Sequence, residues 1–137
     1  MNKHNVFMDY GGAPLILNLS AAAEKNECFR QTLFTGEHLQ VTVMTLPVGE
    51  EIGVEMHENF DQMLRVESGT ALVRVGESKE RLRDVRRIGT GCVLIVPSGT
   101  YHNLLNVGRE PLRLSSVYAP PAHPKGTVHK TRKDADE

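Results

Sequence analysis

The stretch that decides the fold is GCVLIVPSGTYHNLLN, residues 91–106. It begins with an apolar run of the length of a buried strand. Residues 97–99 (Pro-Ser-Gly) then form a turn signal. After the turn the pattern alternates, and a returning strand would place His102, Leu104 and Asn106 on one face. The stretch therefore predicts a β-hairpin that presents a histidine from its inner face.

Outward from this hairpin, alternation of apolar and polar residues with a period of two recurs along the chain. Short turn signals such as ESGT, VGESKE and VGREP separate the alternating segments. Strands at this spacing, with no helices between them, are typical of an all-β sandwich or barrel. The segments that we predict to be strands are residues 38–46, 62–68, 70–75, 81–87, 92–97, 101–107 and 112–118.

Two segments depart from the strand pattern. Residues 20–26 (SAAAEKN) predict one short helical turn capped by Ser20. Residues 119–137 begin Pro-rich and end charged, which predicts an extended strap over the surface, with Thr131 capping a final turn. We expect one domain, 1–137, with a barrel core at about 38–118.

Composition excludes several classes of protein. The chain has 137 residues and a net charge of −1, from 16 Lys+Arg and 17 Asp+Glu, which is not the charge of a nucleic-acid binder. Its apolar runs are all shorter than the roughly 18 residues that a membrane span needs. The N-terminal sequence lacks the apolar core of a signal peptide, and two cysteines make no disulfide framework. We expect a soluble cytoplasmic protein.

A second block, GEEIGVEMHENFDQMLRVESG at residues 49–69, carries more polar groups of interest. Glu55 and His57 are two positions apart, so on a strand both point to the same side. Gln62 shares its face with buried-type aliphatic residues and Asp61 has the opposite face, so parity favours Gln62 as the inward group unless a bulge intervenes. A buried amide needs a partner, and a metal ion would supply one.

These two blocks resemble the two motifs of the cupin superfamily. Residues 91–106 have every fixed residue of the second motif: Gly91, Pro97, Gly99, His102 and Asn106. Residues 49–69 keep the length of the first motif, but Glu55 stands where its first histidine is expected and Gln62 where its glutamate is expected. The resemblance implies a single-domain jelly-roll β-barrel.

The resemblance also implies that Glu55, His57, Gln62 and His102 occupy the four metal-ligand positions. Two imidazoles, a carboxylate and an amide oxygen suit Zn, Mn, Fe(II) or Ni. Two alternatives stay open. Glu55 is a general base beside the metal in the first, and in the second the barrel has lost its metal and serves as a storage or binding protein.

The remaining charged residues and histidines indicate less. His4 and His38 have no partner at ligand spacing, and His123 and His129 lie in the C-terminal tail, so we expect none of the four to be a ligand. Residues 81–87 (RLRDVRR) predict an exposed edge strand protected against pairing. No cluster of Lys or Arg lies near the two motifs, which argues against a sugar-phosphate substrate.

The chain is similar to small bacterial cupins described as mannose-6-phosphate-isomerase-like. The resemblance favours a metal-dependent enzyme that performs isomerase or lyase chemistry on a small sugar or sugar acid, with Glu55 as the carboxylate that moves the proton. The alternatives are a metal-dependent dioxygenase and a non-catalytic binding or sensing module. We expect a homodimer with a small-molecule ligand and no nucleic-acid or membrane partner.

Overall fold

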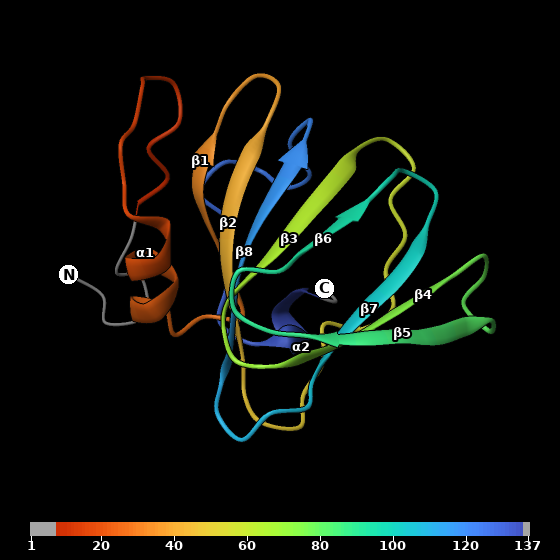
Figure 1. Ribbon diagram of the computed structural model, residues 1–137. Helices are drawn as coiled ribbons and strands as arrows, with labels where there is room; N and C mark the ends of the chain where they lie inside the picture. The colour runs from red at the N-terminus through yellow and green to blue at the C-terminus, as the bar shows by residue number, and fades with distance from the viewer. Residues whose placement is uncertain (1–7, 136–137) are drawn as a thin grey trace.

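The computed structural model describes residues 8–135, so His4 and both ends of the chain lie outside the described residues. Its elements follow the order of Figure 1: α1 (Leu19–Lys25), β1 (Arg30–Thr35), β2 (Gln40–Leu46), β3 (Asp61–Ser68), β4 (Ala71–Gly76), β5 (Leu82–Ile88), β6 (Val93–Val96), β7 (Tyr101–Asn106), β8 (Leu112–Ala119), β9 (Val128–His129) and α2 (Arg132–Ala135). All seven predicted strands are present, with bounds that differ by at most two residues.

The strands form two antiparallel sheets. The larger sheet has the order β6-β3-β8-β2-β1-β9 and the smaller one the order β5-β4-β7. Figure 1 shows the smaller sheet folded across from the larger one, as in a jelly roll. The prediction of an all-β jelly-roll barrel is confirmed.

Between the sheets lies one large apolar core. Its fully buried members include Met44, Leu64, Leu104 and Leu114, which come from both sheets. Burial of each of these side chains contributes about 2 kcal/mol. The period-two pattern is the cause, because alternate residues of each strand face this space and the residues between them face outward.

The short N-terminal helix begins one residue earlier than predicted, and Ser20 is not its cap. The Asn18 side chain accepts the Ala21 N–H at 3.0 Å, whereas the Ser20 hydroxyl donates to Glu67 at 2.8 Å. An asparagine at the position before the first helical residue satisfies a free N–H, and Ser20 is already inside the helix. Neither helix within residues 8–135 is long and apolar enough to cross a bilayer.

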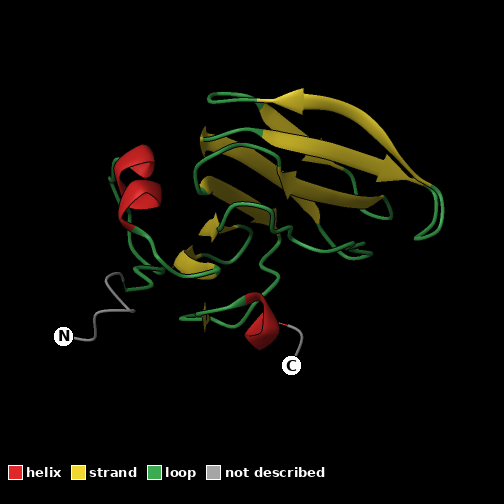
Figure 2. Ribbon diagram, turned by 90° about the horizontal axis from the view of Figure 1, so that it is seen from below, coloured by secondary structure: helices red, strands yellow, loops and turns green. Residues whose placement is uncertain are grey.

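The C-terminal strap is more structured than an extended tail. Its residues Val128 and His129 form β9, which pairs with β1 at the edge of the larger sheet. The short helix α2 follows, and the Thr131 hydroxyl accepts the Asp134 N–H at 3.4 Å, so the predicted cap is confirmed. Figure 2 shows α1 and α2, in red, at the periphery of the strands.

Strand β5 forms an edge of the smaller sheet, as its alternating charges predict. Five consecutive residues of β5 are exposed, and Arg74 of β4 donates to Asp84 at 2.6 Å across the pair. Charged side chains along an open strand discourage pairing with another chain.

Candidate metal centre

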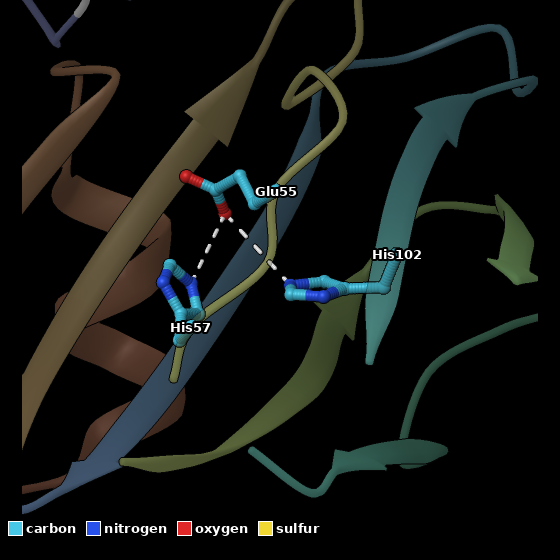
Figure 3. A group of neighbouring side chains, drawn as sticks. All are labelled: Glu55, His57 and His102. Atoms are coloured by element: carbon cyan, nitrogen blue, oxygen red, sulfur yellow. Dashed lines mark ion pairs between the residues drawn. The ribbon is translucent and has the colours of Figure 1, made fainter. Parts of the chain in front are cut away.

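The centre lies where the loop between β2 and β3 meets strand β7. The backbones of Glu55 and His102 exchange two hydrogen bonds, each of 2.9 Å, and so form an isolated bridge. Two residues further, the His57 carbonyl accepts the Gly99 N–H at 2.7 Å. The loop is thereby attached to the hairpin turn and to the strand after it, which fixes the direction of all three functional side chains (Figure 3).

The three side chains point toward one another. Oxygen Oε1 of Glu55 is 3.8 Å from His57 Nε2 and 3.9 Å from His102 Nε2. One ligand atom from each residue can be chosen so that all lie within 4.8 Å of one another. These separations are too long for hydrogen bonds, and they leave room for an ion between the three groups.

Three atoms at this centre are buried without a hydrogen-bond partner in the part of the chain that the structure describes, namely Glu55 Oε1, His57 Nε2 and His102 Nε2. Gln62 Oε1 is a further buried atom without a partner. A buried polar atom without a partner costs about 1–3 kcal/mol, so three in one place call for a common partner. All four can offer a lone pair, and a divalent cation accepts lone pairs from N and O ligands.

The orientation of His102 supports this assignment. Its Nδ1 lies 3.1 Å from the Thr100 carbonyl oxygen, which can only accept, so Nδ1 carries the proton. In the neutral ring Nε2 is then left with a free lone pair that faces Glu55. A backbone carbonyl that fixes the tautomer in this way is the usual partner of a metal-bound histidine.

Gln62 is the inward residue of its strand and Asp61 is not. Gln62 is 3 % exposed, and its Nε2 donates to Ser116 at 3.0 Å. That bond leaves Oε1 as the unpaired end of the amide. Asp61 is exposed and accepts the Ser98 N–H at 2.9 Å on the outside of the barrel. The parity argument is therefore correct for the position of both side chains, while the role of Gln62 as a ligand stays a prediction.

The charge state of the centre also suits a cation. Burial alone would raise the pKa of Glu55, but His57 and the Arg30 guanidinium outweigh it and hold the pKa below its usual value. Burial lowers the pKa of His102, although the Thr100 carbonyl and Glu55 oppose it. A carboxylate that stays ionised beside an imidazole that stays neutral is the protonation state in which both groups bind metal.

Sequence reasoning missed Arg30, the first residue of β1. This arginine is 2 % exposed, and its guanidinium lies 3.5 Å from Glu55 Oε2, on the side of the carboxylate away from the histidines. Its other end approaches His129 Nδ1 at 3.3 Å. The strand itself was not predicted, and a charged residue 25 positions before its partner gives no signal in a single sequence.

A group of aromatic rings lines the side of the centre next to His57. The Phe60 ring stacks on His57 with a centroid distance of 4.4 Å, and Tyr118 meets both rings edge-on. His123 packs edge-on against Tyr118 at 5.2 Å. Burial, with a contribution from Arg30, lowers the pKa of His123 to about 4, so it is neutral at pH 7.

The other described histidines lie outside the three-residue cluster. His38 has a side chain that is 87 % exposed. The C-terminal strap brings His129 to Arg30 and His123 to Tyr118.

The donor set, the free lone pairs and the fixed tautomer together fit one divalent transition metal.

Comparison with known proteins agrees with this fold. The chain is 46 % identical over 134 residues to the uncharacterized protein YrkC of Bacillus subtilis, covering 98 % of this chain and 72 % of that one. A protein of Acanthamoeba polyphaga mimivirus, L612, is 32 % identical over 119 residues, covering 85 % and 72 %.

Among solved structures, BH2720 from Bacillus halodurans is similar over almost its whole length. It superposes with a TM-score of 0.92 at 44 % identity, covering 94 % of this chain and 98 % of that one. Residues 42–118 match the cupin domain family, a span that contains all four residues of the centre. This chain belongs to the cupin family.

Proposed function

We propose that the protein is a metal-dependent enzyme in which Glu55, His57, Gln62 and His102 hold one divalent transition metal, and that it acts on a small polar molecule in the barrel mouth. The single observation that carries the proposal is the set of four buried lone-pair atoms without partners. A protein without a metal would have little reason to keep these atoms unpaired, because each is costly to bury.

A metal held here would act as a Lewis acid that polarises a carbonyl or hydroxyl of the substrate. Neighbouring groups orient or cover the proposed ligands. The Thr100 carbonyl orients His102, Ser116 orients the Gln62 amide, and Phe60 covers one face of His57. Tyr118, fully buried, packs edge-on against both His57 and Phe60 and so closes this side of the centre.

Glu55 fits the role of a ligand better than that of a general base. Its Oε1 faces both imidazoles, while its Oε2 faces Arg30. A carboxylate with a lowered pKa is a weak proton acceptor, whereas a good base has a pKa nearer the working pH. Glu55→Gln separates the roles: a ligand variant loses metal affinity, and a base variant keeps the metal while turnover falls.

For the reaction we favour redox-neutral isomerase or lyase chemistry on a small sugar or sugar acid. The alternative with a specific observation behind it is a dioxygenase, because two histidines and one carboxylate are the donor set of non-haem iron oxygenases. Oxygen consumption by the iron-loaded protein with catechol-type substrates would favour the dioxygenase. Turnover of sugars by the zinc- or manganese-loaded protein would favour the isomerase or lyase.

The first experiment is elemental analysis of untagged protein after metal loading and dialysis. We expect one equivalent of metal per chain in the wild type. The variants Glu55→Ala, His57→Ala and His102→Ala should lose it, and His38→Ala, which changes an exposed histidine, should keep it. A metal-free wild type would contradict the proposal. A tightly bound metal with no turnover across broad substrate panels would instead identify a non-catalytic binding module.

We also propose that the protein works as a cytoplasmic homodimer without nucleic-acid or membrane partners. A net charge of −1 supports the lack of a nucleic-acid partner. Support for the dimer comes from strand β6, an edge of the larger sheet, where Val93 and Ile95 are 42 % and 69 % exposed. Light scattering tests this assembly, and a monomeric mass would contradict it.

A further inference from the structure

A pocket of about 440 Å³ opens directly beside Glu55, on the side away from the two histidines. Its walls come from parts of the chain that are far apart in sequence: β1, the loop before β3, the β4–β5 turn and the C-terminal strap. The polar lining residues that matter here are Arg30, Glu51, Glu55, Lys79, His123 and Arg132. Three of these are permanent cations and two are carboxylates.

Arg30 is buried in this pocket, and part of its hydrogen-bonding capacity is unused. A guanidinium has five N–H donors. Here its contacts to Glu55 and His129 are long at 3.5 and 3.3 Å, and its Nε has no partner among the described residues. A buried guanidinium in this state calls for an acceptor-rich group, because its unpaired N–H groups are costly to bury.

Arg132 reaches the same pocket from helix α2. Its guanidinium lies over Gly53, so close that a side chain added to this glycine would place its first carbon 3.1 Å from Nη2. The Gly53 N–H donates to Asn103 at 3.0 Å, which holds this part of the loop in position. No carboxylate within residues 8–135 forms an ion pair with Arg132 or Lys79. The charges of Arg132 and Lys79 are therefore available to a ligand.

The buried atoms without partners divide into two chemical kinds. Four of them, Glu55 Oε1, His57 Nε2, Gln62 Oε1 and His102 Nε2, can offer a lone pair. The remaining three, Arg30 Nε and the hydroxyls of Thr42 and Tyr118, can donate hydrogen bonds, and of these only Arg30 belongs to a residue that lines the pocket. The first kind suits a cation, and Arg30 Nε suits an oxygen-rich group. When a divalent ion offsets the charge of Glu55, the pocket has a clear excess of positive charge.

We propose that this pocket binds an oxyanionic group of the substrate, a carboxylate or a phosphate, with Arg30 and Arg132 as its cationic partners. The inference rests on the proposed function, because it names the substrate class of the same site. It also bears on the argument against a sugar-phosphate substrate, which rested on the lack of a Lys or Arg cluster near the two motifs. Arg30, Lys79 and Arg132 are distant from one another in sequence and meet only through the fold.

Calorimetric titration of the protein with malonate and with inorganic phosphate tests the proposal. Each anion is titrated into metal-loaded and metal-free protein. The anion with the lower Kd shows whether the pocket prefers a carboxylate or a phosphate. We expect saturable binding, and we expect Arg132→Gln to weaken it by about tenfold, since one charge-assisted contact is lost. Lys133→Gln removes the neighbouring exposed charge outside the pocket and should leave the Kd unchanged.

Three results would overturn the proposal: no saturable binding of either anion to either form, wild-type affinity in Arg132→Gln, or an equal loss in Lys133→Gln. Metal content measured on the same samples separates this test from the previous one. Loss of anion binding in Arg132→Gln without any bound metal would retain the pocket and reject the metal centre. Bound metal with unaltered anion binding in Arg132→Gln would retain the metal centre and reject the pocket.

Discussion

Glu55 and His102 lie directly opposite each other, joined by two backbone hydrogen bonds of 2.9 Å, with Glu55 Oε1 3.9 Å from His102 Nε2. The backbone bonds hold the two side chains at a separation that a direct hydrogen bond does not explain. This relationship attaches an irregular loop to a regular strand. It brings one side chain from the loop and one from the strand close together.

Metal should stabilise the fold, because a ligand that binds only the native state adds to the free energy of unfolding. At a free metal concentration 100 times Kd the gain is about 2.7 kcal/mol, which corresponds to a rise in Tm of about 5–10 °C. Differential scanning fluorimetry with and without metal measures it. His57→Ala should lose the rise and His38→Ala should retain it. An equal rise in both variants would mean that the metal binds elsewhere.

Gln62 should contribute to metal affinity and Asp61 should not. Gln62→Leu keeps the volume of the side chain and removes the oxygen with the free lone pair, so the Kd for metal should rise by about tenfold or more. Asp61→Asn, one position along the same strand but facing outward, is the matched control and should bind as the wild type does. Competition with a fluorescent chelator gives both values. A normal Kd in Gln62→Leu would leave the centre with three protein ligands.

Gly53 and Gly49 both have a positive φ, so their alanine variants can distinguish a loss of stability from a loss of anion binding. Gly53 has φ +98° and Gly49 has φ +81°, so alanine at either position should lower the free energy of unfolding by about 1 kcal/mol or more. Only the new methyl group at position 53 meets the Arg132 guanidinium, because nothing lies within 4 Å of the corresponding point at Gly49. Titration with malonate should show weaker binding for Gly53→Ala alone. Equal affinity in the two variants would contradict the placement of Arg132.

Asp9 should make the stability depend on pH in acid. Burial tends to raise its pKa, but hydrogen bonds from Thr35, Gly11 and Gly126 outweigh burial and lower the pKa from 3.8 to about 2. The native state therefore favours the ionised form, and the contribution is complete above pH 3.8 and lost as the pH falls toward 2.

The corresponding variant is Asp9→Asn. Because Asp9 is only half-buried, we expect a loss of about 1 kcal/mol at pH 7 in urea denaturation, and a loss that shrinks toward zero as the pH falls through 2. Glu37→Gln, which changes a carboxylate that is 87 % exposed, should have little effect at either pH. A loss for Asp9→Asn that stayed constant down to pH 2 would rule out the ionised carboxylate as its cause.

The barrel follows from local patterns in the sequence, and the resemblance to the two cupin motifs implied all four residues proposed as ligands. Alternation fixes which residues of each strand face inward, and it correctly placed Gln62 inside and Asp61 outside. His102 and Asn106 are both buried, and the Asn106 amide donates to carbonyls of Leu46 and Glu110, so it joins loops and does not contribute to the centre.

Glu55 was placed by its spacing from His57, although the structure has no regular strand there. Where a regular strand is missing, the backbone bridge between Glu55 and His102 directs the side chains of Glu55 and His57 inward. The basic pocket could not be predicted, because it depends on non-local pairing. Arg30 reaches Glu55 only because β1 joins the larger sheet. Arg132 reaches the same pocket only because β9 pairs with β1 and leads into α2. No local pattern of a single sequence encodes such a contact.

The most direct test of the metal centre is a crystal structure of the loaded protein, with anomalous data collected on both sides of the metal's absorption edge. We expect one anomalous peak at a distance of about 2.0–2.2 Å from Glu55 Oε1, His57 Nε2, Gln62 Oε1 and His102 Nε2. A peak at any other place, or direct hydrogen bonds among these side chains with no peak between them, would contradict it.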